Sequence, residues 1–164
     1  PAWDGYPVIS PDGRTLVYRA MTRPGFEADR WRVMARDLKT GATRELAPEW
    51  DRSPDTLVFS PDSRTLYALA DSLGQKPLFA IDVAKGGARE LYADGQVRSV
   101  AATRDRLYLL RNDLDSPDEL YALGRDGRGL SQLTELNADY LKDVRFGAFE
   151  QIQFAGHNGH PVYA

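Results

Sequence analysis

Two acidic residues, Glu27 and Asp29, lie two positions apart in the segment GFEADRW and are the residues best suited to binding chemistry. In an extended chain, side chains two positions apart point to the same side, so both carboxylates would face one partner. Clustered carboxylates can hold an ammonium group through charge-assisted hydrogen bonds. The simpler interpretation is a set of surface salt bridges with Arg23, Arg30 or Arg32, because charged loop residues are usually solvated.

Metal binding is the next chemistry to consider, and the sequence predicts none. His157 and His160 could supply imidazole, a common zinc ligand, but they flank a two-residue turn with no carboxylate cluster beside them. Asp12 and Asp62 lack the closely spaced oxygen ligands of a calcium loop, and turn capping explains them better. We therefore predict no metal site and no cofactor.

Nucleophilic catalysis requires a serine on a sharp G-x-S-x-G elbow, with an acid and a histidine further along the chain. No serine in this sequence has a glycine two residues away on both sides. We therefore expect that the 164 residues cannot carry out acyl transfer by themselves.

Composition indicates a folded chain and excludes some partners. Hydrophobic residues make up 42% and charged residues 27% of the sequence, which is typical of globular proteins. The net charge of −3 lacks the basic footprint that nucleic-acid binding needs. No run approaches the eighteen apolar residues of a membrane span. There is no cysteine, which excludes disulfides and leaves periplasm and cytosol equally compatible.

The elements that must carry these residues are strands, because one strand-forming motif occurs twice. SPDGRTLVY at 10–18 returns as SPDSRTLYA at 60–68. In each copy, a proline after a small polar residue sets up a type I turn, and a β-branched and aromatic run follows as a strand. Ser63 replaces Gly13, a change that a type I turn tolerates. The motif predicts the same hairpin in two places.

Later segments extend the repeat to about four strands in every 40 to 50 residues, the spacing of a β-propeller blade. Short strands of one pattern, TREL, AREL and LSQL, close the successive units. We predict three blades at residues 7–47, 55–93 and 97–134, and one or two helical turns within 135–143. The fold class is therefore all-β, a partial propeller of four-stranded antiparallel blades.

Three blades are too few for a ring, since propellers close with about four to eight. The chain also begins at Pro1 without an initiator methionine and ends in strand-like residues. We expect a segment of a longer protein, with blade faces left open that could drive self-association.

The sequence resembles the propeller of the prolyl oligopeptidase family of serine peptidases, in particular the dipeptidyl-aminopeptidase and acylaminoacyl-peptidase branch. The SPD turns alone are weak evidence, since Tol-system and tricorn-like propellers also use them. The C-terminal part is more specific, because it resembles the way these enzymes leave the last blade and enter the hydrolase domain. The residues concerned are SPDELY at 116–121, LT at 133–134, LN at 136–137 and FEQIQFAGHNGHPVYA at 149–164.

The family opens its hydrolase domain with a phrase of the type F-x-G-x-D-G-x-x-V. This chain departs from it at Asn158, although asparagine followed by glycine serves a hairpin turn equally well. The resemblance implies that residues 1–143 are the C-terminal blades of the propeller. It also implies that residues 144–164 are a linker strand and the first hairpin of an α/β-hydrolase domain encoded downstream.

By this resemblance, the segment is the non-catalytic propeller part of a serine-type exopeptidase or oligopeptidase. It would cover and gate the active site, so that only short peptides enter. Glu27 and Asp29 would then be candidates to bind the free ammonium of a peptide substrate, although the family's amine-binding acidic pair usually lies earlier in the propeller.

A different class of function stays open. A Tol-like propeller without a hydrolase would act through protein–protein contacts. A glycan-processing propeller would need carboxylates converging on a central channel, and no pair here suggests one. Cleavage specificity, oligomeric state and compartment are not predicted.

Overall fold

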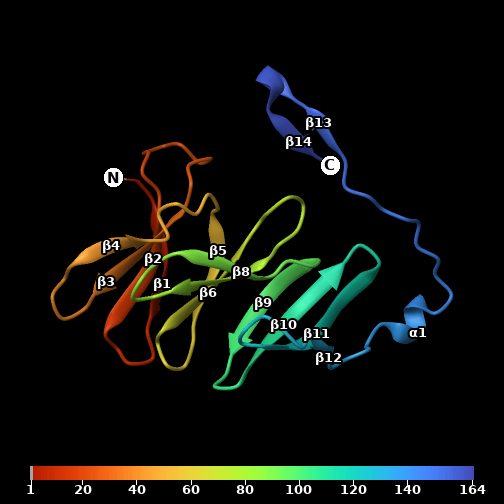
Figure 1. Cartoon of the computed structure of the whole chain (residues 1–164), viewed down its shortest axis with the longest axis horizontal. Coiled ribbons are helices and arrows are strands. Elements are labelled where there is room, and N and C mark those ends of the chain that lie inside the picture. Colours follow the sequence, from red (N-terminus) through yellow and green to blue (C-terminus); the bar gives the residue numbers. More distant parts are fainter. Residues whose placement is uncertain (1) are drawn as a thin grey trace.

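The computed structural model describes residues 2–164 and shows three four-stranded antiparallel sheets followed by a small hairpin (Figure 1). The first sheet contains β1 (Asp4–Ile9), β2 (Thr15–Ala20), β3 (Arg32–Asp37) and β4 (Thr43–Leu46). The second contains β5 (Pro54–Phe59), β6 (Thr65–Ala70), β7 (Leu78–Asp82) and β8 (Ala88–Tyr92). The third contains β9 (Gln96–Ala102), β10 (Arg106–Asp113), β11 (Ser116–Gly124) and β12 (Ser131–Gln132).

The rest of the chain leaves the third sheet through the short helix α1 (Ala138–Leu141). It ends in the hairpin of β13 (Gln153–Ala155) and β14 (Pro161–Tyr163), joined by the 3-10 turn His157–Gly159. No helix in the described residues has the length and apolar character needed to cross a membrane.

The predicted fold class is confirmed. Strands follow one another in order within each sheet, and the three sheets coincide within a few residues with the blades predicted at 7–47, 55–93 and 97–134. The helical turn falls inside the predicted range 135–143. The first strands, β1, β5 and β9, lie next to one another, so the sheets stand side by side in an open arc (Figure 1).

The repeated SPD turns form the same hydrogen bonds in both copies. In the first, the Ser10 hydroxyl donates to Asp12 Oδ1 (2.6 Å), which also accepts from Arg14 N–H (3.1 Å). The second repeats both distances with Ser60, Asp62 and Arg64. The predicted turn-capping role of these aspartates is what the structure shows.

One detail of the second turn differs from expectation. Ser63 lies at φ 62°, in the left-handed region that favours glycine, as Gly13 does at φ 70°. Its hydroxyl accepts a hydrogen bond from Asp12 N–H (3.1 Å) in the neighbouring sheet. The serine therefore joins two blades at a backbone position where it is strained.

Because the pKa of Asp62 is lowered in the folded protein, we expect the stability of the fold to depend on pH. The Ser60 hydroxyl, the Arg64 N–H and the Arg125 guanidinium hold the pKa of Asp62 at about 2, below its usual 3.8. A lowered folded-state pKa stabilises the fold above pH 4, and this stabilisation is lost as pH falls toward 2. We expect Asp62→Asn to lower the free energy of unfolding by about 1 kcal/mol or less at pH 7. The variant should also lose less stability than the wild type as the pH falls from 6 to 2, as measured by thermal unfolding.

The control is Asp105→Asn, a change at an exposed residue in the equivalent turn of the third sheet. It should retain the wild-type slope against pH. If Asp62→Asn lost as much stability as the wild type between pH 6 and 2, the Asp62 carboxylate would not be the source of the pH dependence.

Two hydrophobic clusters hold the sheets together, one in each gap between neighbours. Side chains of β2 to β4 pack on those of β5 to β7, and side chains of β6 to β8 pack on those of β9 to β11. The largest fully buried members are Leu46, Leu57, Leu66, Tyr67, Leu69, Leu78, Ile81, Leu107, Leu109 and Leu123. Since each gap is filled from two sheets, the blades stabilise one another rather than folding as separate units.

Candidate functional site

One end of the three sheets gathers the longer connections and is called the loop face here. It consists of residues 21–31, 47–53, 71–77, 93–95 and 114–115. Its loops are hydrogen-bonded across blades, since Trp31 N–H donates to Ser53 Oγ (3.0 Å) and Arg52 Nη2 to Ser72 Oγ (3.3 Å). The hairpin β13–β14 lies over this same end of the arc (Figure 1).

The segment with Glu27 and Asp29 is not extended, which corrects the expectation that both carboxylates point the same way. Residues 22–30 turn twice, with hydrogen bonds from Phe26 N–H to Arg23 O (3.4 Å) and from Asp29 N–H to Phe26 O (3.1 Å). In such turns, residues two apart do not share a face. The two carboxylates therefore have separate surroundings.

Asp29 serves the loop itself. Its Oδ2 accepts hydrogen bonds from the backbone N–H groups of Thr22 (2.6 Å) and Arg23 (2.8 Å). These bonds, that of Thr22 first, hold the pKa of the Asp29 carboxyl below its usual value. Asp29 closes the loop that carries Glu27.

Salt bridges with the nearby arginines were the simpler interpretation, and the arginines have other partners. Arg30 pairs with Glu45 (2.8 Å), and Arg32 reaches the same carboxylate at 3.9 Å. Arg23 lies over the Phe26 ring, 3.9 Å from its centre. Within residues 2–164, neither Glu27 nor Asp29 forms a salt bridge.

Glu27 lines a pocket of about 370 Å³ that opens on the loop face. Its walls are Trp3, Met21, Arg23, Gly25, Phe26 and Trp31. Aromatic faces attract cations, and a carboxylate beside them can accept hydrogen bonds from an ammonium group. The pocket therefore combines aromatic walls with a carboxylate able to bind an amine, beside the Arg23 guanidinium that covers the Phe26 ring.

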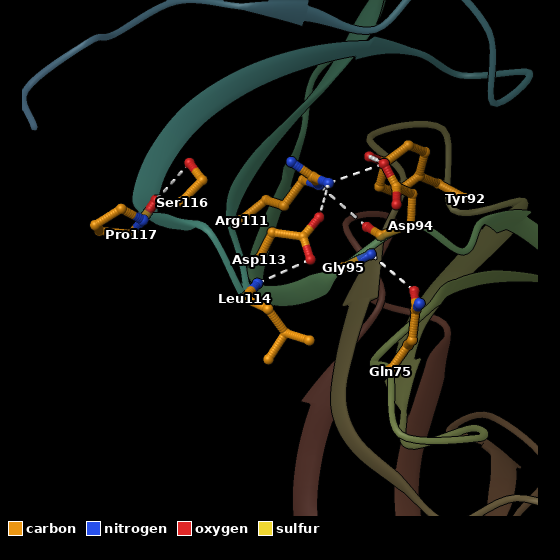
Figure 2. A network of polar contacts seen from close by, with 9 residues as sticks. All are labelled: Gln75, Tyr92, Asp94, Gly95, Arg111, Asp113, Leu114, Ser116 and Pro117. Carbon is orange, nitrogen blue, oxygen red and sulfur yellow. Dashed lines mark hydrogen bonds and ion pairs between the residues drawn. The ribbon is translucent and has the colours of Figure 1, made fainter. Parts of the chain in front are cut away.

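A second feature of the loop face, which the sequence analysis missed, is a network around Arg111 (Figure 2). Arg111 is only 8% exposed, and its Nη2 bonds to Asp94 Oδ2 (2.8 Å) and Asp113 Oδ2 (2.7 Å). Its Nε donates to Asp94 O (3.1 Å), and the guanidinium lies beside the rings of Tyr92 and Tyr121. One buried cation thus joins the loop before β9 to the end of β10.

Neighbouring groups extend this network to a third loop. Gly95 N–H donates to Gln75 Oε1 (2.8 Å), and Leu114 N–H donates to Asp113 Oδ1 (2.9 Å) (Figure 2). Burial raises the pKa of the Tyr92 hydroxyl to about 12, and this hydroxyl donates to Asp94 (3.3 Å). The loops at 71–77, 93–95 and 114–115 therefore form one surface joined by hydrogen bonds and ion pairs. The signal in the sequence was an arginine at an inward position that alternates with Leu107 and Leu109.

A second pocket, of about 340 Å³, lies between this surface and the chain that leads to the hairpin. The loop face and the adjoining ends of β9 and β10 contribute Leu73 to Gln75, Gly95, Gln96 and Asn112 to Leu114, and the other wall is Phe149 to Gln151 with Ala164. The Gln151 side chain donates to Leu73 O across the gap. The approach to the hairpin and the blades thus enclose a space at the loop face.

The two histidines lie on the exposed hairpin and line neither pocket. His157 and His160 flank a turn in which Asn158 (φ 55°) and Gly159 (φ 75°) are both left-handed, as in the expected Asn-Gly turn. In residues 2–164, no three or more histidine and carboxylate side chains come together as a metal site would require.

Comparison with known proteins gives relatives in one group of peptidases. Over 145 residues the chain is 30% identical to dipeptidyl-peptidase 5 of Porphyromonas gingivalis, an alignment covering 85% of this chain and 20% of that protein. The chain spans about a fifth of the length of the curated relatives it matches. No protein-family model matches it.

Solved structures share the fold. An acylaminoacyl peptidase of Pyrococcus horikoshii superposes with a TM-score of 0.76 at 20% identity, over 96% of this chain and 24% of the peptidase. TolB of Acinetobacter baumannii superposes with a TM-score of 0.59 at 18% identity, over 79% of this chain and 32% of TolB. At these identities, the likeness concerns the fold alone.

Proposed function

Because the chain is homologous to the propeller region of the dipeptidyl-peptidase 5 and acylaminoacyl-peptidase family, we propose that it is the non-catalytic propeller part of a serine peptidase acting on short peptides. Residues 1–143 are the blades in this proposal, and residues 144–164 lead into an α/β-hydrolase domain. The observation that carries it is the similarity to dipeptidyl-peptidase 5 over 85% of the chain.

The position of the hairpin supports a gating role. Residues 153–163 lie over the loop face, so a domain that continues from Ala164 would cover the same end of the blades (Figure 1). A peptide would then reach the active site past the pockets of this face. Passage between rigid loops selects substrates by size, and the pocket side chains select by contact.

The first test asks whether residues 1–164 have any peptidase activity without the domain that follows them. Because residues 1–164 contain no G-x-S-x-G serine, we expect the purified segment to hydrolyse aminoacyl and dipeptidyl anilides no faster than buffer. The longer protein should hydrolyse them. Turnover that stays with the segment through further purification would contradict the proposal.

For the site, we propose that Glu27 contacts the ammonium of the peptide and that Asp29 contributes by holding the loop. Glu27 lines the aromatic pocket, whereas Asp29 Oδ2 is engaged by two backbone N–H groups. A charge-assisted hydrogen bond contributes about 1.5–3 kcal/mol. In the longer protein, we therefore expect Glu27→Gln to raise KM for a free dipeptidyl anilide about tenfold or more, with kcat little changed.

Two controls sharpen this test. Glu49→Gln removes a carboxylate from an exposed residue of the loop face that lines neither pocket and should leave KM unchanged. A substrate with an acetylated N-terminus should not respond to Glu27→Gln, because it carries no ammonium. Equal KM values for wild type and Glu27→Gln on the free substrate would remove Glu27 from the site.

The second candidate function is a binding propeller without a hydrolase, which the superposition on TolB supports. The reading frame after Ala164 distinguishes the two. A G-x-S-x-G motif within a few hundred residues favours the peptidase, and an early stop codon favours the binding propeller.

A further inference from the structure

Glu119 is a buried carboxylate that none of the proposed chemistry uses. It lies on β11 opposite Arg111 of β10 in the strand register and is only 3% exposed. Arg111 nevertheless forms its ion pairs with Asp94 and Asp113. A carboxylate buried without an ion pair has to be stabilised by hydrogen bonds, because an unsatisfied buried charge is strongly unfavourable.

All of its side-chain hydrogen bonds come from one short segment, residues 134–137. Thr134 Oγ1 donates to Glu119 Oε2 (2.5 Å), and Asn137 donates to Oε1 through both its backbone N–H and its Nδ2 (3.0 Å each). The Thr134 hydrogen bond is the largest cause that lowers the pKa of Glu119 to about 2. The carboxylate is therefore charged at any physiological pH and binds both residues firmly.

This segment is the place where the chain leaves the third sheet. β12 ends at Gln132, and Leu120 N–H then donates to Thr134 Oγ1 (2.9 Å). After α1, residues 143–155 are exposed throughout. Within residues 2–164, the Gln151 to Leu73 contact is the hydrogen bond that ties this stretch back to the blades. The direction of exit is thus determined largely at residues 134–137.

We propose that Glu119 is a positioning residue: through Thr134 and Asn137 it fixes the exit of the chain, and together with the Gln151 to Leu73 contact at the far end of the exposed stretch it keeps the hairpin β13–β14 over the loop face. The importance of this for catalysis rests on the proposed function, in which the hairpin begins the catalytic domain. The positioning itself belongs to the 164-residue chain and is tested there.

The chain has no cysteine, so two introduced cysteines can carry spin labels at chosen sites. Asp105→Cys labels the third sheet at the end opposite the loop face, and His157→Cys labels the hairpin, both at exposed positions. With Glu119 present, we expect one narrow distribution of label distances by pulsed electron paramagnetic resonance. Glu119→Gln turns one acceptor oxygen into a donor, and we expect the distribution to become at least twice as wide.

Two further variants make the test specific. Thr134→Val removes the hydroxyl that donates to Glu119 and accepts from Leu120 N–H, leaves the Glu119 carboxylate in place, and should widen the distribution in the same direction. Asp118→Asn removes the same charge from the adjacent residue, whose carboxylate instead accepts from Asn112 Nδ2 (2.7 Å), and it should retain the narrow distribution. If Glu119→Gln fails to fold, Thr134→Val decides the outcome.

Hydrogen exchange provides the second measurement. We expect amides of residues 133–141 to exchange at least tenfold faster in Glu119→Gln, with protection of β9 and β10 unchanged. Wild-type distance distributions in both Glu119→Gln and Thr134→Val, or equal broadening in Asp118→Asn, would overturn the proposal. Loss of protection throughout the third sheet would do so as well. Neither measurement uses peptidase activity, so failure here is separate from failure of the proposed function.

Discussion

Replacing Arg111 with methionine is expected to lower the free energy of unfolding by about 2–3 kcal/mol, because it removes a nearly buried cation from between the half-buried Asp113 and the exposed Asp94. Methionine retains the apolar stem but loses the guanidinium that binds Asp94 and Asp113. Asp113 has only 21% of its side chain exposed and would be left without its cation. Urea denaturation followed by circular dichroism measures the change.

The same substitution should also increase the mobility of the loops at 71–77, 93–95 and 114–115, because it removes the cation of the network that joins them. Arg111→Lys is not expected to restore stability, since an ammonium group cannot contact two carboxylates and a carbonyl in the same planar arrangement. Arg98→Met, at an exposed arginine on β9, is the control and should change stability by no more than about 0.5 kcal/mol. Equal stability of Arg111→Met and Arg98→Met would show that the network contributes nothing.

Gly127→Ala is expected to cost about 3 kcal/mol or more, because this glycine allows the second and third sheets to approach closely. Gly127 has φ 87°, and a Cβ there would lie 2.4 Å from the carbonyl oxygen of Leu91. The left-handed conformation alone costs about 1–2 kcal/mol for alanine. The remaining cost arises because the backbone of Leu91, on the edge strand β8 of the second sheet, has to move away from the new Cβ.

A glycine two positions later separates these two effects. Gly129 is also left-handed, at φ 68°, but a Cβ there meets nothing within 4 Å. Gly129→Ala should therefore show only the conformational cost, about 1–2 kcal/mol. Comparing the thermal unfolding of the two variants measures the contribution of the close contact between the sheets. Equal melting temperatures would mean that the Leu91 backbone can move to accommodate a Cβ at no cost in stability.

These predictions describe a molecule in which the blades provide rigidity and the loop face carries the specific side chains. Rigid loops matter in the proposed function, since a gate that selects by size must keep its opening constant. The Arg111 network fixes three loops, Asp29 fixes the loop with Glu27, and Glu119 fixes the exit toward the hairpin. Arg111 and Glu119 join segments of different loops or strands, and Asp29 closes a single loop on itself.

Local patterns in the sequence were sufficient for the fold class and the number of blades. The SPD turns and the strands that follow them are governed by interactions within a few residues, and the contacts of Ser10 with Asp12 and of Ser60 with Asp62 illustrate this. The Asn158-Gly159 turn was predicted for the same reason. Alternation of apolar residues then placed the strands, because a sheet buries every second side chain.

The arrangement of the site depended on tertiary structure. Glu27 and Asp29 have different roles because backbone hydrogen bonds turn their loop, and Asp29 takes part in forming it. Arg111 and Glu119 are neighbours across two strands, yet they bind Asp94 on one side and Thr134 on the other. The sequence by itself determined which segments become strands and turns, since those depend on near neighbours. The packing of the blades decided pairs such as Arg111 with Asp94 and Glu119 with Thr134, since these partners are 17 and 15 residues apart along the chain.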